Sequence, residues 1–244
     1  MRLTRCHIDA PLQPGTELTL PEDTANHLIR VMRLREGEDC VLFNGDGHDY
    51  TARVVAIGKR ESRVRIQSAR ALDNESPLHI TLLQGIARGE KMDLILQKAT
   101  ELGVSAIVPV NAERTEVKLD AARAEKRLAH WRNVLVSACG QSGRARVPLL
   151  SPPLPLAQAA QAQSPAALKL TLDPLGEHRL ATLSAPGAEG VVIAIGPEGG
   201  WSPRDRQALR ESGFQGLQLG PRILRTETAG LAAIAALQAR LGDL

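Results

Sequence analysis

A change of pattern near residue 75 constrains the fold of this chain more than any other feature of its sequence. Before it, β-branched runs follow one another and predict strands at 16–20, 39–43, 48–57 and 63–66. After it, strand and helix patterns alternate. The predicted strands are 78–84, 104–110, 168–172, 191–195 and a short one around Leu217 and Leu219, and the predicted helices are 90–102, 120–139, 203–212 and 226–241. Such alternation favours a parallel α/β sheet.

The polar segment 73–77, which ends in a proline, is typical of a linker, so we expect domains at 1–72 and 76–244. In the first, Asn44-Gly45 predicts a hairpin turn, and one helix from Pro21 to Met32 interrupts the strands. Short strands with one helix suggest a small β-barrel. Residues 148–165 predict a surface loop with one or two helical turns.

Composition excludes several classes of protein. No stretch approaches the 18 apolar residues of a membrane span, and the N-terminus lacks the apolar core of a signal peptide. Three widely spaced cysteines and scattered histidines predict neither a disulfide framework nor a metal site, which fits a cytoplasmic protein. The net charge is only +3, but 24 of the 30 basic residues are arginine. Clustered arginine suits phosphate recognition, although a GC-rich genome and solvated surfaces explain it as well.

Two loops rich in glycine and proline follow predicted strands. Residues 196–200 (Gly-Pro-Glu-Gly-Gly) come directly after the strand 191–195, and residues 220–225 (Gly-Pro-Arg-Ile-Leu-Arg) follow Leu219. Open parallel sheets bind ligands beyond the carboxyl ends of their strands. Neither loop has the spacing of a dinucleotide-binding or P-loop motif, so the pair indicates another ligand.

These motifs carry a family resemblance. Residues 195–202 and 219–229 resemble the 16S ribosomal RNA (uridine-N3) methyltransferase family, a member of the SPOUT superfamily. Further segments of the family resemble residues 27–33, 91–93, 97–104, 113–115 and 141–144. Gly140 departs from its pattern, in which a glutamate is usual at this position.

The resemblance implies a fold, a cofactor and a substrate. It implies a PUA-like β-barrel followed by an α/β domain with a C-terminal trefoil knot, and a homodimer formed through that domain. It also implies S-adenosylmethionine as methyl donor and N3 of a uridine in the decoding region of 16S rRNA as acceptor, on the assembled small ribosomal subunit. The residues expected to bind the cofactor are Leu172, Gly196, Pro197, Glu198, Gly199, Gly200, Leu219, Gly220, Ile223, Leu224, Arg225 and Thr228.

Methylation of N3 requires loss of its proton, so the site needs a base or a cation that stabilises the uracil anion. Glu198 and Glu227 are the candidate bases, and Arg225, Arg144 and Arg114 are the candidate cations. Other interpretations stay open, because Glu227 also suits the first turn of a helix and Glu198 could order its own loop.

RNA contacts are expected from His27, Arg30 and Arg33, which share one helical face, and from Arg114. A solvated basic face is the alternative. The final helix is apolar on more than one side, which favours a partner surface. Two rival functions remain: a non-catalytic RNA-binding adaptor, and an α/β enzyme such as a nucleotide hydrolase, whose phosphate or metal site the sequence lacks.

Overall fold

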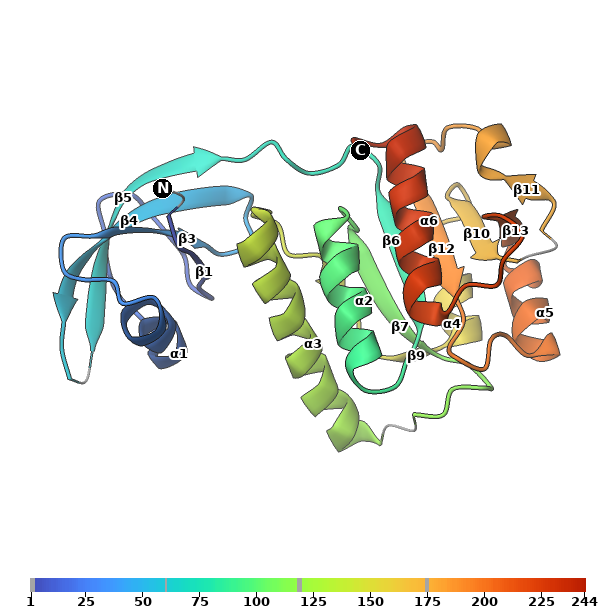
Figure 1. Cartoon of the computed structure of the whole chain (residues 1–244), viewed down its shortest axis with the longest axis horizontal. Coiled ribbons are helices and arrows are strands. Elements are labelled where there is room, and N and C mark those ends of the chain that lie inside the picture. Colours follow the sequence, from blue (N-terminus) through green and yellow to red (C-terminus); the bar gives the residue numbers. More distant parts are fainter. Residues whose placement is uncertain (1–2, 60, 118–119, 174–175) are drawn as a thin grey trace. The chain divides into compact units, whose positions relative to one another are not determined.

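The computed structural model describes residues 3–59, 61–117, 120–173 and 176–244. The chain forms two compact units, whose helices and strands are labelled in Figure 1. The first comprises Met1–Glu75 with Val136–Val147, and the second comprises Ser76–Leu135 with Pro148–Leu244. The division therefore differs from the expected one, because a segment from the middle of the chain joins the first unit.

The first unit is built on a five-stranded sheet. Its strands are β1 (Arg5–His7), β2 (Glu17–Thr19), β3 (Asp39–Phe43), β4 (His48–Ile57) and β5 (Ser62–Ala71). Their order is β1-β3-β4-β5-β2, so β1 and β2 lie at the two edges. The predicted hairpin is confirmed, because β3 and β4 pair antiparallel across the turn at Asn44-Gly45.

One helix covers this sheet, in two parts. Helix α1 (Glu22–Ala25) continues as η1 (Asn26–Val31), where the hydrogen bonds widen to a five-residue spacing, as from Met32 N–H to the His27 carbonyl at 2.9 Å. The predicted helix from Pro21 to Met32 is confirmed in extent, and the wider turns of η1 were not predicted. The wider turns place Leu28 fully in the apolar core while Ala25 and Ile29 pack beside it.

A buried arginine explains why Val136–Val147 belongs to the first unit. The Arg5 guanidinium pairs with Asp49 (Nη2 to Oδ1, 2.6 Å) and donates to the Cys139 carbonyl at 2.7 Å. Its side chain is 6% exposed. Cys139 lies near the end of α3 (Ala121–Ser142), so one charged group ties the end of a long helix to the sheet. Neither β1 nor this contact was predicted, because three residues are too few for a periodic signal.

The second unit is a parallel α/β sheet, as the sequence predicts. Its strands are β6 (Ile80–Gly85), β7 (Ala106–Asn111), β8 (Leu149–Leu150), β9 (Leu154–Pro155), β10 (Leu168–Leu172), β11 (His178–Arg179), β12 (Val191–Ile195) and β13 (Gln215–Gln218). The order is β11-β13-β10-β12-β6-β7-β8, with β9 also on β7. The strand β12 is fully buried and lies between β6 and β10.

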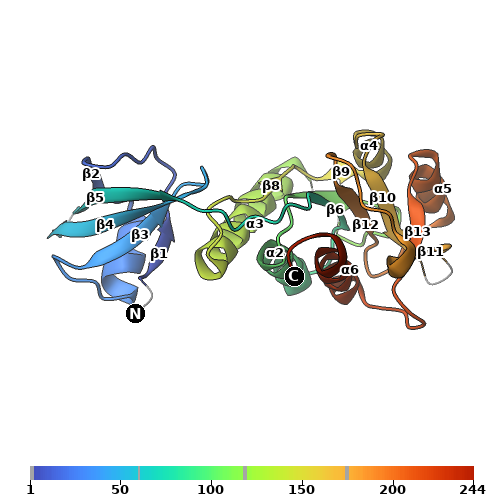
Figure 2. The same cartoon turned by 90° about the horizontal axis from the view of Figure 1, so that it is seen from above.

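Helices cover both faces of this sheet (Figure 2). Helices α2 (Glu90–Glu101) and α6 (Thr226–Leu241) pack side by side on one face, and α4 (Leu156–Gln161) and α5 (Pro203–Glu211) pack together on the other. A single 3₁₀ turn, η2 (Leu180–Thr182), follows β11. After β13 the chain crosses back, because α6 packs against β12 and β6 in the middle of the sheet.

Two structural findings bear on the classes excluded above. Within the described ranges, no helix is long and apolar enough to cross a membrane. The three cysteines carry free thiols, and burial raises the pKa of Cys40 to about 12 and that of Cys139 to about 11.

Candidate ligand-binding site

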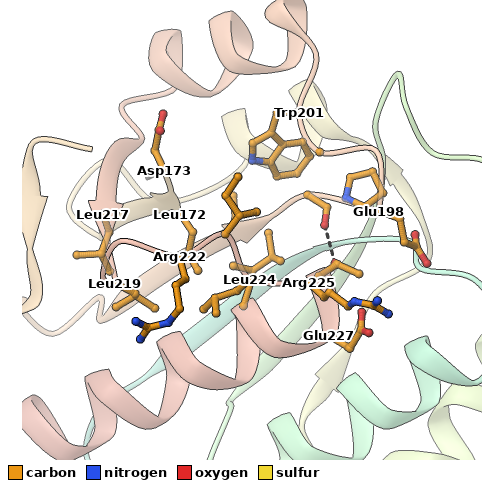
Figure 3. A pocket seen from close by; sticks show the side chains of 18 of the residues that line it. Leu172, Asp173, Glu198, Trp201, Leu217, Leu219, Arg222, Leu224, Arg225 and Glu227 are labelled. Carbon is orange, nitrogen blue, oxygen red and sulfur yellow. Dashed lines mark hydrogen bonds between the residues drawn. The ribbon is translucent and has the colours of Figure 1, made fainter. Parts of the chain in front are cut away.

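A cavity of about 490 Å³ opens where β10, β12 and β13 end. Its walls come from the end of β10, the loop 196–202 after β12, the loop 219–225 after β13 and the first turn of α6 (Figure 3). This volume falls within the range typical of sites for small molecules and cofactors. The two loops meet because β12 and β13 both flank β10 in a parallel sheet, so their carboxyl ends share one edge.

The cavity has a leucine-lined part and an acidic end. Figure 3 shows Leu217 and Leu219 on the same side as Asp173, Leu172 and Leu224 nearer the centre, and Glu198 and Glu227 at the opposite end. Leu217 is fully buried. The arrangement suits a ligand with a flat apolar portion on one side and charged groups on the other.

The first turn of α6 is fixed by one buried threonine. Thr226 Oγ1 donates to the Gly196 carbonyl at 2.6 Å, the contact drawn in Figure 3, and accepts from Gln84 Nε2 at 3.0 Å. Gln84 also donates to the Gly85 carbonyl at 2.9 Å. The hydroxyl therefore joins the end of β6, the loop after β12 and the start of α6.

Glycine is required where the loop 196–202 meets the end of β6. A Cβ on Gly85 would lie 2.4 Å from the Pro197 nitrogen, closer than any side chain can approach. On the cavity side, Gly220 has φ +119°, a backbone conformation that favours glycine. Gly85 thus allows backbone to approach backbone, and Gly220 adds no side chain to the cavity wall.

A neighbouring segment supports the same loop from outside. Arg114 Nη1 donates to the Gly199 carbonyl at 3.1 Å, and Glu113 N–H donates to Asp205 at 3.3 Å. Asp205 also completes a capping box with Ser202 at the start of α5. The loop is thus held at both ends before any ligand enters.

Charged groups gather at the end of the cavity near α2. Lys91 Nζ lies 3.4 Å from Glu198 Oε1 and 3.9 Å from Glu227 Oε2. Glu198 Oε1 also accepts the Arg88 N–H at 3.1 Å. Burial raises the pKa of Glu198, but hydrogen bonds from backbone N–H groups and the Lys91 ammonium outweigh it, so the net pKa is lowered. Glu198 is therefore firmly ionised at neutral pH.

The Asp173 side of the cavity carries an ion pair, and an indole also lines the cavity. Arg206 Nη1 pairs with Asp173 Oδ2 at 3.0 Å, and both residues line the cavity. Trp201 is buried, and its Nε1 donates to Thr171 Oγ1 at 3.0 Å. No group of three or more His, Cys, Asp or Glu side chains is arranged to hold a metal ion in the part of the chain that the structure describes.

The structure brings most of the predicted cofactor residues together. Those that line the cavity are Leu172, Gly196, Pro197, Glu198, Gly200, Leu219, Gly220, Ile223, Leu224 and Arg225, together with the candidate base Glu227. Gly199 is not among them, because its Cα faces the Arg114 side chain, and Thr228 is exposed on α6. Sequence reasoning missed Lys91, Asp173, Trp201 and Arg206, which come from other elements of the fold.

Two predicted arginines have structural partners instead. The Arg144 guanidinium is 7% exposed and pairs with Glu75 in the first unit, with Nε 3.1 Å from Oε1. Arg114 holds the Gly199 carbonyl, as described above. Both groups are thus occupied, which leaves Arg225 as the candidate cation that lines the cavity.

The residues predicted to contact RNA lie on the first unit. His27, Arg30 and Arg33 are all exposed. Arg33 has φ +58°, an uncommon conformation for a residue with a side chain, and it follows the wide turns of η1. Exposed Val31 and Met32 lie beside them in the chain, so this helix end presents both basic and apolar groups.

Comparison with known proteins identifies the family. Residues 74–238 match the model of an RNA methyltransferase domain, and residues 20–67 match that of an RNA methyltransferase PUA domain. A Mycobacterium bovis protein named ribosomal RNA small subunit methyltransferase E is 31% identical over 94% of this chain and 89% of its own. The chain belongs to this family of RNA methyltransferases.

Solved structures of similar proteins agree in fold. The family member from Neisseria gonorrhoeae, solved with S-adenosylmethionine bound, is 41% identical, with a TM-score of 0.92 over the whole of both chains. A Legionella pneumophila protein, also solved with this molecule bound, is 39% identical, with a TM-score of 0.95 and the same full coverage. The whole-chain match extends the family to both units.

The bridge at Thr226 leads to a prediction. Thr226→Val keeps the shape but leaves the Gly196 carbonyl and the Gln84 amide without their buried partner, so it should lower the free energy of unfolding by about 1–3 kcal/mol. Thr228→Val on the exposed face of the same turn is the matched control, with an expected change within about 0.5 kcal/mol. Urea unfolding measures both. Equal stability of the two variants would contradict the bridge.

Proposed function

We propose that this protein is an S-adenosylmethionine-dependent methyltransferase that modifies N3 of a uridine in 16S rRNA, on the assembled small ribosomal subunit in the cytoplasm. The observation that carries the proposal is the cavity between the loops 196–202 and 219–225, in a chain of the RNA methyltransferase family. Relatives of 39% and 41% identity hold S-adenosylmethionine, which supports the same cofactor here.

The residues that line the cavity fit this cofactor. The leucine-lined part, with Leu172, Leu219 and Leu224, offers walls for an adenine ring. The sulfonium lies between the adenosine and the methionine ammonium, and the Glu198 carboxylate, on the side of the cavity away from Leu219, suits these two positive charges. When bound, the cofactor supplies an activated methyl group on its sulfonium. The chain's own task is to hold the uracil in line with that group and to remove or compensate the N3 proton.

Catalytic roles follow from which charged groups face the cavity. Arg225 lines it at the start of α6 and is the group that we propose to stabilise the developing uracil anion. Glu198 and Glu227 are the carboxylates at the same end. Arg144, with its guanidinium on Glu75, fits a structural role better than a catalytic one.

The first unit supplies RNA contacts in this proposal. Many of its basic groups are already neutralised, since Arg53 pairs with Asp39 and Arg63 pairs with Glu17. His27, Arg30 and Arg33 are the exposed groups that we propose to bind phosphate. We also propose that the five-stranded sheet closes into the PUA-like barrel that the family resemblance implies.

The proposal extends to the trefoil knot and the homodimer. The return of α6 from β13 to the middle of the sheet supports a threaded chain end.

The dimer is supported by apolar groups that remain exposed. Ala233, Ile234 and Leu237 on the buried face of α6 pack towards the sheet, but Leu231 and Ala235 remain half-exposed. Ile223, at the rim of the cavity, is 87% exposed. A second copy would cover these apolar groups.

The first test combines cofactor binding with product analysis. Leu219→Asp places a charge in the leucine-lined part of the cavity and should weaken S-adenosylmethionine binding by about 10- to 100-fold, the equivalent of losing one buried leucine. Leu149→Asp, at a leucine that is 75% exposed, is the control and should bind normally. Calorimetry measures both.

Mass analysis of nucleosides from 16S rRNA should show N3-methyluridine, and absence of this product would refute the activity.

A second test concerns the RNA surface. If Arg30 and Arg33 contact phosphates, the double variant Arg30→Ala, Arg33→Ala should lower the salt slope of subunit binding by roughly 0.7–0.9 per lost contact. Cofactor affinity should stay the same. Arg53→Ala is the control, because Asp39 already neutralises that guanidinium. A salt slope unchanged in the double variant would place the RNA elsewhere.

A third test is the oligomeric state. Light scattering at micromolar concentration should give twice the subunit mass of 26.2 kDa. Leu231→Glu puts a charge on the half-exposed apolar side of α6 and should shift the protein towards single subunits. A wild-type mass of one subunit would overturn the dimer.

A further inference from the structure

The two glutamates at the α2 end of the cavity differ in how their oxygens are used. Glu198 Oε1 accepts the Arg88 N–H at 3.1 Å and lies 3.4 Å from Lys91 Nζ. Glu227 Oε2 is buried and has no hydrogen-bond partner among the described residues. Lys91 lies 3.9 Å from it, beyond hydrogen-bond distance. Hydrogen bonding within the protein thus engages Glu198, while Glu227 keeps one oxygen that can accept a hydrogen bond from a ligand.

A buried acceptor without a partner is costly, and such a group calls for an explanation in a folded protein. Glu227 lines the cavity, and its side chain is 16% exposed, so a ligand rather than bulk water is the natural partner. A ligand N–H directed at Oε2 would satisfy it. Lys91 lies beyond hydrogen-bond distance of that oxygen, and Glu227 stands in the first turn of α6, where the helix dipole favours a carboxylate.

We propose that Glu227 is the catalytic residue that accepts the N3 proton, while Glu198 and Lys91 are positioning residues. This inference rests on the proposed function. The N3–H bond breaks, its electron pair stays on the ring nitrogen, and the proton passes to Glu227 Oε2. The N3 lone pair forms the bond to the methyl carbon, and the electrons of the broken carbon–sulfur bond remain on sulfur. No further reactant is needed.

The position of Glu227 follows from its neighbour in the chain. Thr226 is hydrogen-bonded to Gly196 and Gln84, so the backbone of the first turn of α6 is fixed. The side chain of Glu227 therefore starts from a fixed position. Glu198, by contrast, links its loop to the turn before α2 through the Arg88 N–H. Its carboxylate therefore orders the loop, as one interpretation of the sequence allowed. A general base must be held within hydrogen-bond reach of the proton that it removes, and Glu227 lines the cavity from a helix turn that Thr226 fixes in place.

The test compares Glu227→Gln with Glu198→Gln. Glutamine keeps the shape of Glu227 but cannot accept a proton, so single-turnover methylation should fall about 10²- to 10⁴-fold. Cofactor affinity, measured by calorimetry, should change no more than about twofold, because the lost interaction belongs to the transition state. Glu198→Gln should mainly weaken cofactor binding. Glu101→Gln is the matched control. Glu101 pairs with Lys98 at the surface of α2, the helix that carries Lys91, and this variant should behave as the wild type.

Substrate acidity separates a base from a structural group. Fluorine at C5 of the target uridine makes N3–H more acidic, and alkaline pH removes the proton without a base. Both changes should restore much of the lost rate in Glu227→Gln and little in Glu198→Gln. Loss of cofactor binding in Glu227→Gln, or no rescue by fluorine and alkali, would overturn the inference. If the wild type forms no N3-methyluridine at all, the proposed function fails instead.

Discussion

One buried hydroxyl determines how the ligand-binding edge of this protein is assembled. Thr226 Oγ1 binds the Gly196 carbonyl and the Gln84 amide, groups that lie 30 and 142 residues away in the chain. A buried donor or acceptor that loses its partner destabilises the fold, so all three segments must come together at once. The cavity, the first turn of α6 and the approach of Pro197 to Gly85 depend on this junction.

The site is organised before a ligand binds. Arg114 holds the Gly199 carbonyl, Asp205 caps α5 and accepts the Glu113 N–H, and the prolines in both loops restrict the backbone. Less conformational entropy is then lost on binding than in flexible loops of the same length. The two acidic groups also differ in role. Glu198 accepts a hydrogen bond from the Arg88 N–H, whereas Glu227 Oε2 has no hydrogen-bond partner among the described residues.

Sequence reasoning succeeded where the signal is local and periodic. The buried strand 191–195 and the helix 226–241 lie where their patterns predict them. It failed for β1 and β8, which have three and two residues, since such strands exist only through their partners. The helix 21–32 was predicted without its π-helical part η1, in which Leu28 is fully buried, because apolar spacing along the chain does not reveal which carbonyl each N–H reaches.

The sequence by itself determined the α/β architecture of the second unit, the two glycine loops and the family. These features depend on the order of residues along the chain, through hydrophobic period and backbone freedom. Only the tertiary structure decided which side chains face the cavity. It brought Lys91 to the two glutamates, turned Gly199 towards Arg114, and placed Arg144 on Glu75. Side-chain direction and the pairing of charges depend on elements that are distant in sequence, so the spacing of residues carries no signal for them.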